Sequence, residues 1–138
     1  MQDRDRAMLT SLLGLKVRRE QTIRTELIRL SQQEKVLDDE KFQLTNEQRG
    51  VWQEWQACSE SQGVLDQTEL VDLKERLAHY FQQDQMIIEQ LAVIKTQWDK
   101  LQLARAEQQA LLRKTLLEQE KLTYLLEEMK YEASKTRR

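Results

Sequence analysis

The sequence predicts an all-α fold in which two long helices form an antiparallel coiled-coil hairpin. Apolar residues recur every three or four positions over residues 70–101, which is the period of one face of a helix. The 138-residue chain contains no proline and only 3 glycines, so little interrupts the backbone. Signals for the end of one helix and the start of another coincide at a single place, near Gly63.

The first helix is expected over residues 3–59, and it presents two columns of seam residues. The apolar column has a spacing of seven residues and consists of Ile23, Leu30, Leu37, Leu44, Val51 and Cys58. The companion column consists of Leu13, Glu20, Leu27, Glu34, Lys41, Gln48 and Trp55. Because several members of the companion column are polar, the seam of the first helix is weaker than an all-apolar coiled coil. Gly50 lowers the stability of a helix by about 1 kcal/mol relative to alanine. The seven-residue spacing of the apolar column nevertheless continues beyond it.

The turn is expected over residues 60–66. Gly63 is of the residue type that commonly ends helices. Asp66 and Glu69 form an Asp-x-x-Glu pattern related to the capping box, in which the aspartate accepts the free amide three residues later. A short turn between long helices makes them antiparallel neighbours, so residues 1–138 are expected to form a single hairpin domain.

The second helix is expected over residues 67–135. Its stripe consists of Leu70, Leu73, Leu77, Tyr80, Asp84, Ile87, Leu91, Ile94, Trp98 and Leu101. Apart from Asp84 the stripe is apolar, which is typical of a coiled-coil seam. Folding the chain symmetrically about Gly63 places Asp84 near Lys41 and predicts an ion pair between them. Beyond Leu101 the seam becomes more polar. Each polar residue there lacks the ~1.5–3 kcal/mol of stability that a fully buried leucine would contribute. We therefore expect a partner to cover this open end of the hairpin.

Several function classes are disfavoured by composition. A near-balance of 22 basic and 24 acidic residues argues against a dedicated nucleic-acid binder. No segment approaches the ~20 apolar residues needed to cross a bilayer, so no membrane insertion is expected. Cys58 and His79 are the only residues of their types, which leaves no metal-ligand spacing and no cysteine pair. Neither a phosphate loop nor a catalytic constellation is recognisable, so we expect no catalytic, metal or cofactor site.

Aromatic residues gather on either side of the expected turn and form the first candidate partner-binding group. Its members are Trp52, Trp55, Tyr80 and Phe81. Trp55 and Tyr80 fall on seam positions, so simple packing between the helices is one interpretation. Trp52 and Phe81 lie beside the seam, where partly exposed aromatic residues are typical of interaction hot spots.

Basic residues near the two chain ends form the second candidate group. Its members are Arg18, Arg19, Arg24, Arg137 and Arg138. An ordinary solvated helix face explains such a group without any function. The alternative is an electrostatic docking surface for an acidic ring or surface of a partner.

The architecture and two runs of sequence resemble the YscO/FliJ family of stalk proteins of type III secretion systems and the flagellar export apparatus. The runs are LAHYFQQDQMIIEQL over residues 77–91 and EEMKYEASKTRR at the C-terminus. The resemblance covers nearly the whole chain and rests on a proline-free, glutamine-rich hairpin with a longer second helix rather than on a signature motif.

This resemblance implies a non-enzymatic cytoplasmic protein, peripheral to a membrane-embedded secretion apparatus. Family members are similar in shape to the central stalk of rotary ATPases. Their terminal half binds the hexameric export ATPase, and the remainder contacts the export gate and, in some members, secretion chaperones. By this resemblance the basic open end would face the ATPase, and the aromatic group would face the gate or a chaperone.

A structural coiled-coil adaptor, formed by two straight chains as a homodimeric scaffold, is the alternative function. Residues 59–70 separate the two interpretations. A helix continuous through Gly63 favours the straight dimer, whereas a turn there favours the hairpin.

Overall fold

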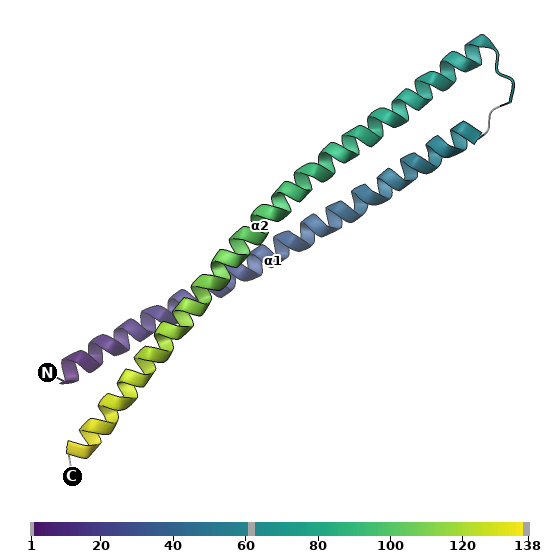
Figure 1. Ribbon diagram of the computed structural model, residues 1–138. Helices are drawn as coiled ribbons and strands as arrows, with labels where there is room; N and C mark the ends of the chain where they lie inside the picture. The colour runs from purple at the N-terminus through teal and green to yellow at the C-terminus, as the bar shows by residue number, and fades with distance from the viewer. Residues whose placement is uncertain (1, 61–62, 137–138) are drawn as a thin grey trace. The chain divides into compact units, whose positions relative to one another are not determined.

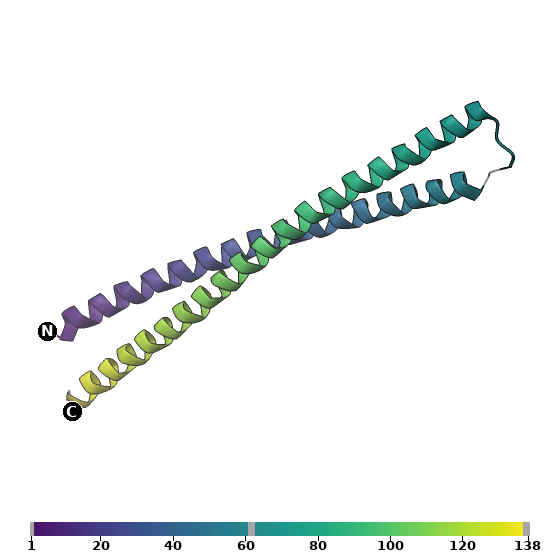
Figure 2. The same cartoon turned by 45° about the horizontal axis from the view of Figure 1, so that its top comes forward.

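The computed structural model describes residues 2–60 and 63–136, within which the chain forms helix α1 (Gln2–Glu60) and helix α2 (Gln67–Thr136). The helices run in opposite directions and pack against each other, as Figure 1 and Figure 2 show from two sides. This arrangement confirms the predicted all-α hairpin. The chain divides into an open-end unit (1–32 with 102–138) and a turn-end unit (33–101).

The start of α2 is capped as the sequence predicts. The backbone N–H of Glu69 donates to Oδ1 of Asp66 over 2.7 Å, and the N–H of Leu70 donates to the Asp66 carbonyl over 3.0 Å. Asp66 therefore satisfies amides that the first turn of a helix leaves without an internal partner. Residues 61–62 of the expected turn lie outside the described residues.

The apolar column of α1 is the inner face of that helix. All of its members are buried or half-buried: Ile23, Leu30, Leu37, Leu44, Val51 and Cys58. Leu30 is the most deeply buried of them, with 2% of its surface exposed. The companion column is half-buried except at Lys41 and Trp55, which are exposed.

The stripe of α2 is also confirmed as a seam. In the turn-end unit its positions from Leu73 to Leu101 are all buried or half-buried, whereas Leu70 at the helix start is exposed. In the open-end unit the same period continues with the buried residues Thr115 and Leu122. A buried threonine where a coiled coil prefers leucine makes this part of the seam less apolar.

The register between the helices of the turn-end unit differs from the symmetric one. Asp84 accepts hydrogen bonds from Nε2 of Gln48 over 3.0 Å and from Nε1 of Trp52 over 2.9 Å. The predicted pairing of Asp84 with Lys41 is therefore wrong. Gln48 lies one heptad beyond Lys41 along α1. A seam that repeats every seven residues packs comparably after a slip of one heptad, so the apolar columns alone do not fix the register.

Candidate partner-binding sites

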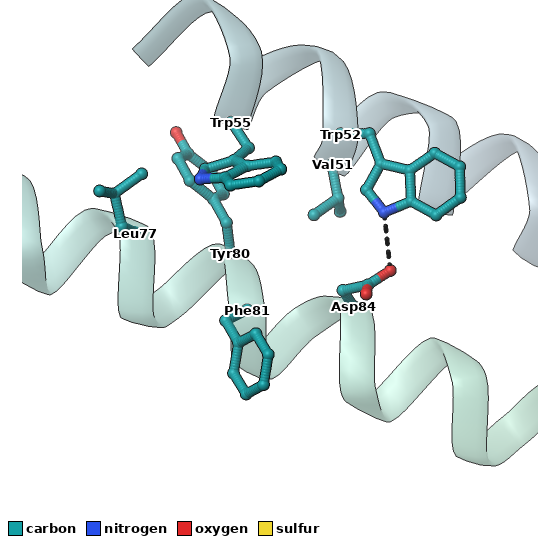
Figure 3. A pocket seen from close by; sticks show the side chains of 7 residues that line it. All are labelled: Val51, Trp52, Trp55, Leu77, Tyr80, Phe81 and Asp84. Atoms are coloured by element: carbon teal, nitrogen blue, oxygen red, sulfur yellow. Dashed lines mark hydrogen bonds between the residues drawn. The ribbon is translucent and has the colours of Figure 1, made fainter. Parts of the chain in front are cut away.

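The predicted aromatic group lines one pocket in the turn-end unit, which we call the aromatic pocket (Figure 3). It has a volume of about 350 Å³. Helix α1 contributes Val51, Trp52 and Trp55, and helix α2 contributes Leu77, Tyr80, Phe81 and Asp84. All four aromatic residues singled out from the sequence are thus brought together.

Three of the four aromatic side chains in this pocket expose half or more of their surface to solvent. Trp52 is 51% exposed, Trp55 is 50% exposed and Phe81 is 64% exposed. Tyr80 is half-buried, as its seam position predicts, but the seam interpretation of Trp55 is wrong. Packed helices lie only about 8–10 Å apart, and two helices cannot enclose several large rings at one level. The rings therefore form the walls of a pocket instead of a closed core.

The pocket contains one charged group, the carboxylate of Asp84. Figure 3 shows the Trp52 indole directed at this carboxylate from the opposite helix. The surrounding sequence is acidic, because residues 47–84 contain eight acidic and three basic side chains. The pocket thus combines exposed aromatic faces with a negative charge, which suits the binding of a partly apolar, partly cationic group.

The basic group is less concentrated than the sequence suggests. Arg18, Arg19 and Arg24 are exposed on α1 in the open-end unit. Nε of Arg24 donates to Oε2 of Glu20 over 2.8 Å, which offsets part of its charge. Arg137 and Arg138 lie outside the described residues. Arg18 and Arg19 are therefore the described members of the group best placed to meet an acidic partner.

Polar contacts join the two helices of the open-end unit. Lys16 forms an ion pair with Glu118. Nε2 of Gln119 donates to the Lys16 carbonyl over 3.2 Å and to Oε1 of Glu20 over 2.9 Å. The hydrogen bond from Lys16 lowers the pKa of Glu118, and the hydrogen bonds from Arg24 and then Gln119 lower the pKa of Glu20.

Acidification is expected to destabilise the open-end unit through these two carboxylates. A carboxylate whose pKa is lowered on folding contributes stability above its ordinary pKa, here 4.5, and loses it as the pH falls through the lowered value. The melting temperature, followed by circular dichroism from about pH 6 to about pH 3, should fall more steeply for the natural protein than for a double variant, Glu20→Gln with Glu118→Gln. Identical pH profiles would contradict the role of both groups.

A further surface of α2 was not recognised as a site from the sequence. Five residues spaced by seven, all exposed, form what we call the outer column: Leu103, Ala110, Leu117, Tyr124 and Tyr131. They belong to the open-end unit and lie off the seam. The seven-residue spacing of the outer column was visible in the sequence. The seam positions of α2 repeat with the same period, so the spacing alone did not distinguish the outer column from the seam.

Two aromatic residues of the outer column have local partners on α2. The Tyr124 hydroxyl donates to Oε1 of Glu128 over 3.0 Å, and this hydrogen bond raises the pKa of Tyr124. Nζ of Lys135 lies 6.0 Å from the centre of the Tyr131 ring. These contacts leave both tyrosine rings exposed, so their apolar faces remain accessible to a partner.

Residues 2–60 and 63–136 show neither a metal-binding cluster nor a membrane-spanning helix. No cluster of three histidine, cysteine, aspartate or glutamate side chains there is placed to hold a metal ion. Within the same ranges, neither helix has an apolar stretch long enough to span a membrane.

Comparison with known proteins does not extend this description. No family model, no curated protein and no solved structure matches the chain.

Proposed function

We propose that the protein is a central-stalk component of a type III secretion export apparatus and acts by binding, without catalysis. It works in the cytoplasm at the membrane-embedded apparatus. Its open-end unit binds the hexameric export ATPase, and its turn end binds the export gate or secretion chaperones. The resemblance to the YscO/FliJ family and the observed antiparallel hairpin support this proposal.

The observation that carries the proposal is the outer column of the open-end unit. A stalk inside a ring of subunits must offer binding residues on its outer surface as well as a seam that holds its helices together. The exposed residues Leu103, Leu117 and Tyr124 supply such a second apolar surface on α2. Apolar residues aligned along a surface are typical of binding faces.

The charge of the open-end unit supports the same assignment. Arg18 and Arg19 are exposed on α1. Exposed basic side chains accelerate and orient the docking of an acidic surface. They add specificity to the contact that the outer column makes.

The proposal is tested by mixing the full-length chain with a purified export ATPase from the same genome. The natural chain is expected to increase the hexamer fraction, measured by sedimentation velocity, and the rate of phosphate release. Leu117→Asp should weaken both effects by at least about tenfold, because a charge replaces an apolar contact worth roughly 1.5–3 kcal/mol.

A matched control places the same new charge outside the outer column. Val93 is exposed on α2 in the turn-end unit, and Val93→Asp should leave hexamer formation and phosphate release unchanged. If the natural chain changes neither quantity, or if both variants behave alike, the proposed role of the open-end unit is refuted.

A structural coiled-coil adaptor that pairs as a homodimer is the second candidate function. It is favoured by the same outer column, which two copies of the hairpin could bury against each other. Sedimentation equilibrium of the chain alone separates the two functions. A dimer that Leu117→Asp converts to a monomer, together with no effect on the ATPase, would favour the adaptor.

A further inference from the structure

We propose that the aromatic pocket recognises an arginine side chain presented by a partner protein, with Asp84 as the counter-charge. The inference deepens the partner-binding part of the proposed function, because it specifies the chemistry of the turn-end contact.

The hydrogen bonding of Asp84 leaves a place for a cation. Gln48 and Trp52 are both neutral donors, and both of their hydrogen bonds end on Oδ1. They orient the carboxylate without neutralising its charge, and Oδ2 remains to accept from a ligand. A half-buried carboxylate in an apolar stripe gains most from a cation that is hydrogen-bonded to it.

The walls of the pocket favour a guanidinium over an ammonium group. Trp52, Trp55 and Phe81 each expose half or more of their surface. A planar guanidinium stacks on such rings and donates to a carboxylate at the same time, whereas an ammonium group is compact and more strongly hydrated. Arginine therefore fits the pocket better than lysine.

The electrostatic surroundings also distinguish this pocket from its neighbour in the turn-end unit. Asp84 is the one charged residue among those that line the aromatic pocket, so its lining carries a net negative charge. A second cavity includes Trp98 and four charged residues whose signs balance, Asp38, Lys41, Lys95 and Asp99. Excess negative charge attracts a cation to the aromatic pocket, and the balanced rim gives the second cavity no such preference.

The size of the aromatic pocket suits a side chain. Its volume of about 350 Å³ is at the lower end of the roughly 300–1,000 Å³ typical of small-ligand pockets. The partner therefore presents a single arginine into the pocket and makes its other contacts on the exposed surface around it.

The test is a titration of the full-length chain with N-acetyl-arginine amide, followed by nuclear magnetic resonance of the three indole N–H signals. Each signal is assigned with a Trp→Phe variant. The Trp52 and Trp55 signals should shift and saturate, while the Trp98 signal, from the second cavity, should stay in place. The neutral analogue N-acetyl-citrulline amide should bind at least about tenfold more weakly, and N-acetyl-lysine amide should fall between the two.

Variants establish which residues recognise the cation. Asp84→Asn should weaken arginine binding at least about tenfold, whereas Asp99→Asn, an exposed carboxylate on the same helix, should not change it. Phe81→Leu removes an exposed ring without touching Asp84 and should weaken binding about threefold. This variant keeps the test decisive if Asp84→Asn disturbs the fold.

Equal binding of arginine and citrulline, or full affinity in both Asp84→Asn and Phe81→Leu, would overturn the inference. A shift of the Trp98 signal equal to those of Trp52 and Trp55 would also overturn it. The titration contains no export protein, so its failure leaves the ATPase result unaffected. Failure of the ATPase assay likewise leaves the titration informative.

Discussion

Replacing Ile87 with aspartate is expected to lower the free energy of unfolding of the turn-end unit by about 3–5 kcal/mol. Ile87 is 7% exposed and lies in the middle of the α2 seam. A carboxylate buried at this position loses the hydration that stabilises its charge. Since small domains are stable by only about 5–15 kcal/mol, much of this unit should unfold.

Tryptophan fluorescence during urea denaturation measures this effect, because all 3 tryptophans lie within residues 33–101. The matched control is the neighbouring residue, Ile88, which is 43% exposed on the same helix. Ile88→Asp should cost less than about 1 kcal/mol, as surface substitutions generally do. Equal losses for the two variants would show that Ile87 is not a seam residue.

Replacing Leu30 with alanine is expected to destabilise the open-end unit by about 2–5 kcal/mol. Leu30 is 2% exposed and is the largest fully buried side chain among the described residues. Its truncation removes apolar contact and leaves a cavity between the helices. The polar contacts at Lys16 and Gln119 do not replace that loss, because partly exposed polar pairs contribute little.

Circular dichroism at the helix band detects this loss, and tryptophan fluorescence should change less, because no tryptophan lies in the open-end unit. Ile28→Ala is the control, since Ile28 is 61% exposed on the same helix. That variant should change the free energy of unfolding by less than about 0.5 kcal/mol. A Leu30→Ala protein as stable as the control would contradict the assignment of Leu30 to the core.

The seam could be predicted from the sequence almost residue by residue. Periodicity alone identified Leu30, Ile87 and Ile94 as inward-facing, and all three are buried. The cap at Asp66 was also predictable, because capping depends on residues that are close together in the chain. Each of these features depends on residues that are close together in the chain, so the sequence is sufficient to predict it.

The candidate sites could be predicted only in part. The sequence identified the four aromatic residues of the pocket, but it treated Trp55 as a seam residue and did not connect Asp84 with them. It included Arg24 in the basic group but did not predict the hydrogen bond from Arg24 to Glu20. The outer column was obscured by a seam of the same period on the same helix. Which residues share a site depends on how the helices meet.

The sequence by itself determined that this chain forms two helices, where the second begins, and which face of each is covered. Only the tertiary structure decided the register, and with it the partners of Asp84. The physical reason is that helix periodicity and capping depend on residues a few positions apart. A heptad seam, by contrast, packs comparably in two registers that differ by seven residues. Contacts across the helices, such as the Trp52 indole on Asp84, distinguish one register from the next.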